Sequence, residues 1–120
     1  MSAHRVDKVE KLIKEQVSYI LLHKMPDDDL GFITVTEVKV SADLKIAKVY
    51  LSVLHKERRD FVINKINSRL GHIRTELAHG IRIKFVPELK FFIDDTLDYV
   101  EKIEGLINEI HKQNNNQSNT

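Results

Sequence analysis

The sequence predicts an α+β domain in which helices cover one face of a three-stranded sheet. Three observations lead to this prediction. Segments near both ends place apolar residues three or four positions apart, as amphipathic helices do. Two segments rich in β-branched residues follow each other closely in the first half. A third alternating segment follows a central helical segment. The resulting order of helix, strand, strand, helix, strand, helix packs naturally as helices on one face of a sheet.

The amino-acid composition further limits the class of protein. The chain has 120 residues, of which 42% are hydrophobic and 31% charged, which is typical of one globular domain. It contains no cysteine, which excludes a disulfide framework, a thiolate nucleophile and a cysteine-based zinc site. The N-terminus lacks the apolar core of a signal peptide, and no apolar run approaches the roughly 20 residues of a membrane span. We expect a soluble, cytoplasmic protein with no membrane partner.

The first half reads as a helix followed by a hairpin. Residues 3–23 carry an apolar stripe, Ser2 is a candidate N-cap, and residues 26–31 form a loop by composition. Residues 32–40 form a strand whose apolar parity changes midway, which indicates either a bulge near Thr36 and Glu37 or burial on both faces. A turn at 41–44 leads into a regular strand at 47–53, so the two strands should pair antiparallel.

The second half reads as helix, strand and helix. Residues 57–79 have a buried helical stripe interrupted by Gly71, where we expect a kink or a tight junction between two helices. Residues 81–93 alternate as one strand, and Pro87 places that strand at a sheet edge or requires a bulge. A last helix spans about residues 95–112. The domain therefore covers residues 1–112, and the polar tail 113–120 should be disordered.

Charge is distributed unevenly along the chain. The formal net charge is +1, but residues 55–84 contain eight Lys or Arg against three acids, whereas the last helix is acidic. On an ideal helix most of these basic residues, together with two histidines, lie away from the apolar stripe: Arg58, Lys65, Arg69, His72 and His79, with Arg82 and Lys84 following. Such a cluster binds phosphates or is simply a solvated face, and composition favours the two equally.

No catalytic motif or cofactor-binding motif is present. His72, Glu76 and His79 share a helical face and could in principle meet a metal, but an exposed polar face is the favoured interpretation, so we predict no metal and no cofactor. The acidic run 27–29 lacks the ligand spacing of a calcium loop. Tyr50 and Phe92 could stack on bases, although core packing is favoured for Phe92.

Several blocks of sequence resemble one known family. They are Thr36–Leu44 (TEVKVSADL), Ala47–Val53 (AKVYLSV), Gly71–Arg74 (GHIR), Ile81–Lys84 (IRIK) and Pro87–Phe91 (PELKF), in this order. Together they resemble the bacterial ribosome-binding factor A proteins over roughly residues 5–110. The resemblance implies a type II KH-like fold in which a helix-kink-helix with an Ala-x-Gly signature replaces the usual GxxG loop. In this chain the signature is Arg69-Leu70-Gly71, so the alanine position is occupied by arginine.

The resemblance also implies a function. It implies a non-enzymatic factor that binds the free small (30S) ribosomal subunit and promotes late maturation and 5′-end processing of 16S rRNA. It further implies a role in growth at low temperature and release by a ribosome-assembly GTPase. We expect a monomer whose RNA-binding residues are Arg58, Lys65, Arg69, Gly71, His72, His79, Arg82 and Lys84. The alternative is a protein-interaction domain that uses its acidic last helix or a sheet edge.

Overall fold

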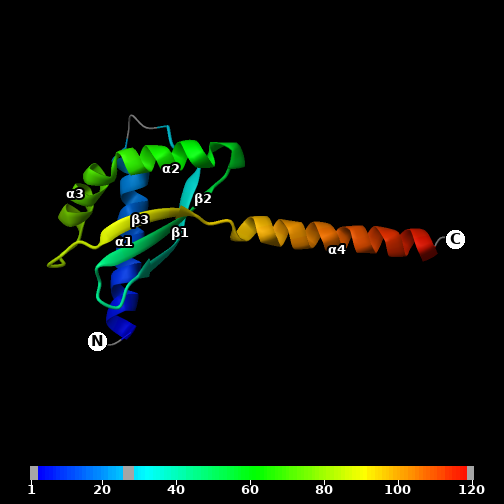
Figure 1. The fold of residues 1–120 in the computed structure, drawn as a ribbon, viewed down its shortest axis with the longest axis horizontal. Coiled ribbons are helices and arrows are strands. Elements are labelled where there is room, and N and C mark those ends of the chain that lie inside the picture. Colours follow the sequence, from blue (N-terminus) through cyan, green and yellow to red (C-terminus); the bar gives the residue numbers. More distant parts are fainter. Residues whose placement is uncertain (1–2, 26–28, 119–120) are drawn as a thin grey trace.

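The computed structural model describes residues 3–25 and 29–118. The proposed cap at Ser2 and the residues 26–28 of the first loop lie outside the described residues. The elements follow in the order α1 (Ala3–His23), β1 (Ile33–Val40), β2 (Ile46–Val53), the short 3₁₀ helix η1 (Lys56–Arg58), α2 (Arg59–Ser68), α3 (Leu70–Gly80), β3 (Glu88–Ile93) and α4 (Thr96–Ser118). This arrangement confirms the predicted α+β class (Figure 1).

The three strands form one sheet in the order β1-β2-β3. β1 and β2 pair antiparallel, as predicted, and their register shifts between Val35 and Glu37. This shift is the expected bulge, and it allows Val35 to be buried together with Val38 and Val40. β3 pairs parallel with β2 and therefore lies at an edge of the sheet. The remaining alternative, a first strand buried on both faces, is wrong, because Thr34, Glu37 and Lys39 are exposed.

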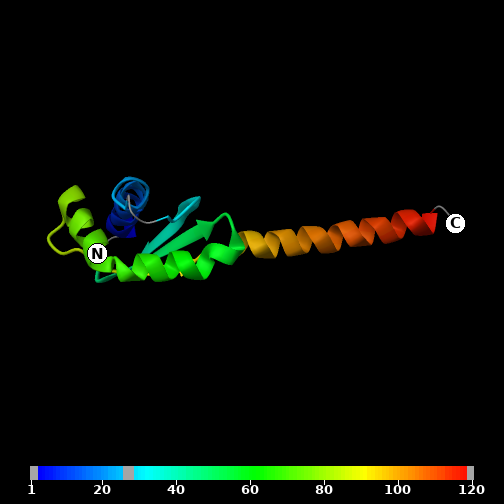
Figure 2. The same ribbon diagram turned by 90° about the horizontal axis from the view of Figure 1, so that it is seen from above.

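The core lies between one face of the sheet and three helices. β2 directs Ala47, Val49, Leu51 and Val53 into it, and the helices contribute the stripes predicted from their periodicity. The side chains that are completely buried in the helices are Ile13, Val17, Val62, Ile66, Ile73 and Leu77. Figures 1 and 2 show α1 against the sheet and α2 and α3 running across its end and side.

The alternating segment 81–93 is only partly a strand, so the prediction of one long strand is wrong. β3 begins at Glu88, immediately after Pro87, and the Glu88 amide donates to the Lys45 carbonyl at 2.8 Å. Pro87 has no amide hydrogen, so the ladder cannot extend through it. Before it, Ile81 is buried but Phe85 is 74% exposed, and residues 81–87 form an irregular loop. Alternation continues through this loop without strand pairing.

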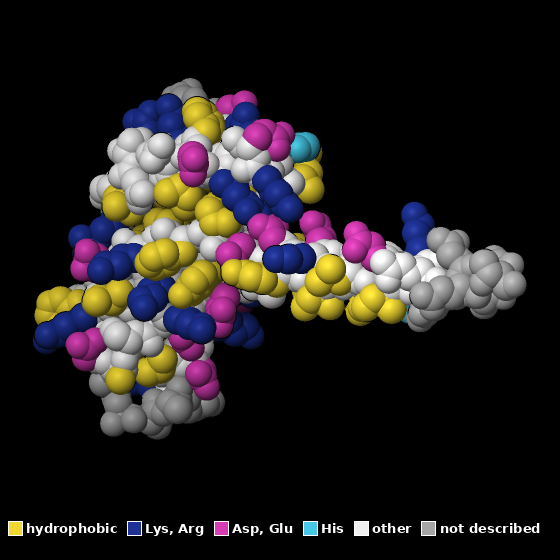
Figure 3. Space-filling model, turned by 45° about the vertical axis from the view of Figure 1, so that its right-hand side comes forward, with side chains coloured by type: hydrophobic (Ala, Val, Ile, Leu, Met, Phe, Trp, Pro, Cys, Tyr) yellow, Lys and Arg dark blue, Asp and Glu magenta, His cyan; other side chains and the backbone are white. Residues whose placement is uncertain are grey.

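Helix α4 projects from the body of the molecule on the side opposite α3 (Figures 1 and 2). It continues to Ser118, so the end predicted at residue 112 is too early, and residues 113–118 of the predicted disordered tail are helical. Residues 119 and 120 lie outside the described part of the chain. Figure 3 shows hydrophobic side chains along one side of α4 and acidic side chains along another. The apolar residues are all exposed, namely Leu97, Val100, Ile103, Leu106, Ile107 and Ile110.

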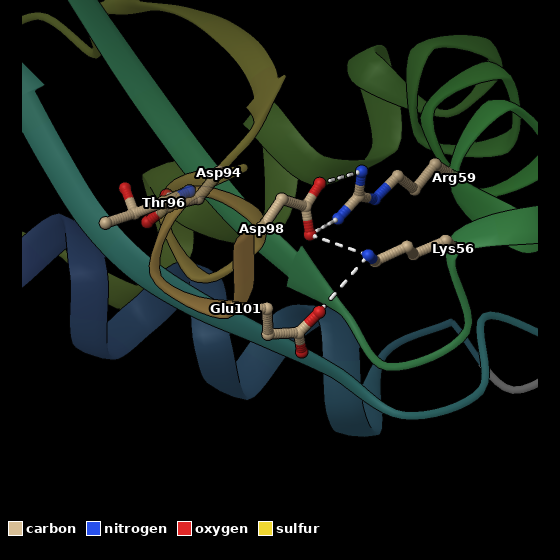
Figure 4. A network of polar contacts seen from close by, with 6 residues as sticks. All are labelled: Lys56, Arg59, Asp94, Thr96, Asp98 and Glu101. Carbon is tan, nitrogen blue, oxygen red and sulfur yellow. Dashed lines mark hydrogen bonds and ion pairs between the residues drawn. The ribbon is translucent and has the colours of Figure 1, made fainter. Parts of the chain in front are cut away.

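Ion pairs hold the first turns of α4 to the start of α2 (Figure 4). Arg59 donates from both terminal nitrogens to the two carboxylate oxygens of Asp98, at 2.7 and 3.0 Å. Lys56 lies 3.4 Å from Asp98 and 3.3 Å from Glu101. The bidentate arginine pair is the stronger contact, because two parallel charge-assisted hydrogen bonds also fix its geometry.

These contacts shift the pKa values of the partners. The hydrogen bond from Arg59 lowers the pKa of Asp98, and the hydrogen bond to Glu101 raises the pKa of Lys56. Just before α4, hydrogen bonds from Thr36 and Thr96 lower the pKa of Asp94. Because Asp98 has a lower pKa in the folded than in the unfolded chain, its pairing stabilises the docked helix at neutral pH. This contribution is lost as the pH falls through the lowered value.

The buried stripe predicts the effect of a core truncation. Ile73→Ala should lower the free energy of unfolding by about 2–5 kcal/mol, because Ile73 is completely buried and its removal leaves a cavity. The matched change Ile103→Ala in α4 removes a side chain that is 57% exposed and should cost no more than about 0.5 kcal/mol. Urea unfolding of both variants measures this difference, and equal losses would contradict the placement of the core.

The ion pair at α4 predicts an NMR titration. The Asp98 carboxyl should titrate below the ordinary aspartate value, and Arg59→Gln should move its midpoint upward because the main hydrogen-bond donor is lost. Arg58→Gln is the matched control, since the Arg58 guanidinium contacts Asp29 and not Asp98. A midpoint that does not move in Arg59→Gln would show that this pair does not hold α4.

Candidate nucleic-acid interface

The central helical segment breaks at Arg69. Helix α2 ends at Ser68, α3 begins at Leu70, and Arg69 between them has φ −114° and ψ 16°. The Arg69 amide donates to the Ile66 carbonyl, and its own carbonyl accepts from the Ile73 amide, both at 3.0 Å. The predicted kink is therefore confirmed, and the residue that forms it is the arginine of the Arg69-Leu70-Gly71 signature.

Gly71 does not have the role expected of it. It is the second residue of α3, and its backbone does not adopt a positive φ, as that of Gly31 does. A Cβ atom built on Gly71 would meet no heavy atom within 4 Å beyond the neighbouring backbone. Of the two alternatives expected at Gly71, a kink and a tight junction between two helices, the kink is confirmed and the tight junction is wrong.

Two of the expected RNA-binding residues, Arg58 and His72, also fasten α2 and α3 to the end of α1 and the loop that follows it. The Arg58 guanidinium donates to the Asp29 carbonyl, lies 3.7 Å from its carboxylate, and stacks over the Phe61 ring at 5.0 Å. The His72 Nε2–H donates to the Lys24 carbonyl at 2.7 Å. These contacts make Arg58 and His72 positioning residues.

Lys65, Arg69 and His79 remain as candidates for direct contact along α2 and α3. Arg69 and His79 are exposed and Lys65 is half-buried. Lys65 and Arg69 also take part in interactions within the protein. Arg69 stands at the break, between the C-terminal end of α2 and the first amides of α3.

Arg82 and Lys84 belong to a separate groove. They lie in the loop before β3, where a groove of about 740 Å³ is lined by this loop, the β1–β2 turn and the start of α1. Arg5 and Lys45 line the same groove, so four cations converge there. Sequence reasoning missed Arg5 and Lys45, because no local pattern links positions 40 residues apart that only the fold brings together.

The expected single basic face is thus divided. His72 contacts the residue after the C-terminal end of α1, whereas Arg82 and Lys84 share a groove with Arg5 near its N-terminal end. Arg5 and His23 are 18 positions apart, which corresponds to about 27 Å of helix at 1.5 Å per residue. The candidate interface has two parts, the α2–α3 surface (Lys65, Arg69, His79) and the groove.

The aromatic candidates form a pair on the outer face of the sheet. Tyr50 and Phe92 are opposite each other in the β2–β3 register, and their ring centroids are 5.6 Å apart in a stacked arrangement. Phe92 is 41% exposed, so the expectation that it packs in the core is wrong; its neighbour Phe91 is buried instead.

The described residues contain neither a metal-binding cluster nor a helix that could span a membrane. Among residues 3–25 and 29–118, no group of three or more His, Asp or Glu side chains is placed to hold a metal ion. In the same residues no helix is both long and apolar enough to cross a bilayer.

Comparison with known proteins gives one consistent result. The model of the family "Ribosome-binding factor A" matches residues 5–107. A ribosome-binding factor A from Thermodesulfovibrio yellowstonii is 44% identical over 108 residues, which cover 90% of this chain and 92% of that protein. The solution structure of a putative ribosome-binding factor A from Thermotoga maritima is similar with a TM-score of 0.65 and 29% identity, covering 77% of this chain and 89% of that one.

A second similar structure shares the fold at lower identity. It is a homology model of the Thermus thermophilus ribosome-binding factor A, fitted into the cryo-EM map of a complex of that protein with the 30S subunit. Its TM-score is 0.59 at 20% identity, and the match covers 78% of this chain and 96% of that one. These structures have a KH-like fold, which agrees with the predicted fold class.

The environment of Gly71 predicts a stabilising substitution. Gly71→Ala should raise the free energy of unfolding by about 0.5–1 kcal/mol, because alanine is favoured in a helix and its Cβ meets open space. Gly31→Ala is the comparison, since Gly31 has φ +70° and a side chain there should cost about 1–2 kcal/mol. Thermal and urea unfolding measure both changes. If Gly71→Ala instead destabilises the protein, the two helices do form a tight junction at Gly71.

Proposed function

Because the chain belongs to the ribosome-binding factor A family, we propose that it binds the free small (30S) ribosomal subunit as an assembly factor. In this proposal it promotes late maturation and 5′-end processing of 16S rRNA without catalysing a reaction. The observation that carries the proposal is the family match over residues 5–107. The Thermus thermophilus neighbour, fitted into the map of a 30S complex, supports the choice of subunit.

The α2–α3 surface is well suited to contact phosphates. Lys65 and Arg69 bring two cations to the helix break, where they can bind phosphate oxygens. His79 extends this surface to the last turn of α3. Phosphate contacts of this kind fix orientation and carry little sequence information, so binding should depend on RNA shape and charge.

Arg58 and His72 serve the same surface indirectly. Their contacts with Asp29 and Lys24 hold the two helices against the α1–β1 segment. Arg82 and Lys84 supply a second cluster of cations at the groove. A rigid body with two separate basic regions would hold a particular arrangement of rRNA segments, as maturation requires.

The remaining parts of the proposal follow from the family. The protein acts as a monomer in the cytoplasm, supports growth at low temperature, and leaves the subunit with the help of a ribosome-assembly GTPase. It needs no cofactor for this work. The absence of a catalytic motif in the sequence is consistent with a binding role.

A second candidate function is protein docking through α4. The observation that favours it is the exposed apolar side of this helix, with side chains such as Ile103 and Ile107 about half exposed at 57% and 46%. A docking helix of this kind would bind through apolar contact. Its binding would weaken much less with salt than phosphate binding does.

Charge reversal on the α2–α3 surface tests the proposal. Lys65→Glu combined with Arg69→Glu should abolish co-sedimentation with free small subunits, because it replaces attraction to phosphates by repulsion. Lys11→Glu combined with Lys14→Glu makes the same change in net charge on the exposed side of α1 and serves as the control. Sucrose-gradient profiles measure binding, and melting temperatures exclude unfolding.

Two results would count against this account. Undiminished binding by the Lys65 and Arg69 variant would show that the α2–α3 surface is not the site. Binding of the unmodified chain that is insensitive to salt would instead favour docking through α4.

A further inference from the structure

The groove beside β3 has the dimensions of a ligand site. Its volume is about 740 Å³, within the range of roughly 300–1,000 Å³ that small-molecule sites occupy. Its walls come from three separate parts of the chain, namely the start of α1, the β1–β2 turn and the loop 81–87. A site built from three segments has a defined shape.

The polar lining of the groove is predominantly positive. Arg5, Lys45, Arg82 and Lys84 line it, and all four are exposed to an incoming ligand. Among the described residues that line it, Asp43 is the only acid. Its carboxylate accepts hydrogen bonds from the Ser41 hydroxyl at 2.6 Å and from the Lys45 amide at 3.1 Å, and the four cations outweigh its single negative charge. The groove therefore suits an anion.

The apolar lining provides a surface for a flat ring. Leu44 and Phe85 contribute accessible apolar surface to the wall, and Phe85 is 74% exposed, whereas Pro87 is buried behind them. The Lys84 ammonium lies 5.4 Å from the centre of the Phe85 ring, so a cation and an aromatic face occur side by side. An exposed phenylalanine next to cations is the combination that binds bases and phosphates of single-stranded nucleic acids.

The turn that forms one wall adopts an unfavourable backbone conformation. Leu44 has φ +61°, a left-handed conformation that glycine or asparagine adopts at lower cost. Its amide closes the turn by donating to the Ser41 carbonyl at 2.8 Å. Strained residues of this kind concentrate at ligand sites, and here the strained residue contributes its side chain to the groove.

We propose that this groove holds one unpaired nucleotide of RNA, with its base against Phe85 and Leu44 and its phosphates among Arg5, Lys45, Arg82 and Lys84. This inference rests on the proposed function and specifies which form of RNA the groove takes. A base in a duplex has both faces covered by its neighbours, so it cannot stack on Phe85. The groove therefore selects a bulged, looped or terminal nucleotide.

Binding of short RNAs tests the proposal. A fluorescent single strand of about eight adenylates matches the site size of small binding modules, and a duplex of the same length is the comparison. Fluorescence anisotropy with the full chain should show tighter binding of the single strand. Phe85→Ala should weaken single-strand binding about tenfold, because base stacking is lost, while leaving binding of inorganic polyphosphate unchanged.

Charge variants test the cations of the groove, and a second phenylalanine outside the groove serves as the aromatic control. In Arg82→Gln combined with Lys84→Gln, the slope of the logarithm of the binding constant against the logarithm of the salt concentration should be about 1.4 less negative. This is about 0.7 for each lost phosphate contact to a single strand. Phe32→Ala removes a phenylalanine that is 77% exposed but lies outside the groove, and it should bind RNA like the unmodified chain. Melting temperatures of all variants should stay close to that of the unmodified chain.

Several outcomes would overturn the inference. The first two are equal affinity for duplex and single strand, and no measurable binding of the single strand. The third is unchanged RNA binding by Phe85→Ala. The fourth is displacement of the RNA by micromolar adenosine monophosphate, which would indicate a site for free nucleotides. Co-sedimentation with small subunits separates this inference from the proposed function. If Phe85→Ala loses RNA binding but the unmodified chain does not co-sediment, the groove is confirmed and the proposed function fails.

Discussion

Burial of the inner face of the sheet determines most of this structure. That face is completely apolar along β2, and α1, α2 and α3 must all reach it. Helix α2 packs against β3, whereas α3 packs against α1. The break at Arg69 changes the direction of the helical segment, so that Ile66 is buried under α2 while Ile73 and Leu77 are buried under α3, next to α1. The kink therefore lets each half pack on a different element, and it leaves a cation at the surface where the helices separate.

Packing of the helices on the sheet also places the cations in different environments. Arg58 and His72 contact the end of α1 and the loop after it, where they help to hold the helices in place. Lys65, Arg69 and His79 lie along the surface of α2 and α3, and Arg82 and Lys84 follow in a loop that packing does not pair into the sheet. Helix α4 is held differently, by ion pairs of Lys56 and Arg59 with Asp98 and Glu101, and its apolar side stays uncovered. It is the element best suited to change position.

Local periodicity predicted the elements well, because burial on one face imposes it directly. The bulge between Val35 and Glu37 and the buried stripe of α2 and α3 could both be predicted from apolar spacing. The limits of β3 could not, since residues 81–87 keep the alternation of a strand although Pro87 prevents pairing. The site was predicted only in part. Helical geometry predicted the exposure of Arg69 and His79. The partners of Arg58 and His72, and the position of Arg5 and Lys45 beside Arg82, depend instead on contacts between distant segments.

The central claim is that two basic regions of a KH-like body contact RNA of the small subunit. Ultraviolet crosslinking of the full chain on free small subunits, followed by mass spectrometry of the protein, tests this claim most directly. The account predicts nucleotide adducts on peptides from α2–α3 and from residues 82–87, with few on α4. Adducts confined to α4, or crosslinks to ribosomal proteins with none to RNA, would contradict it.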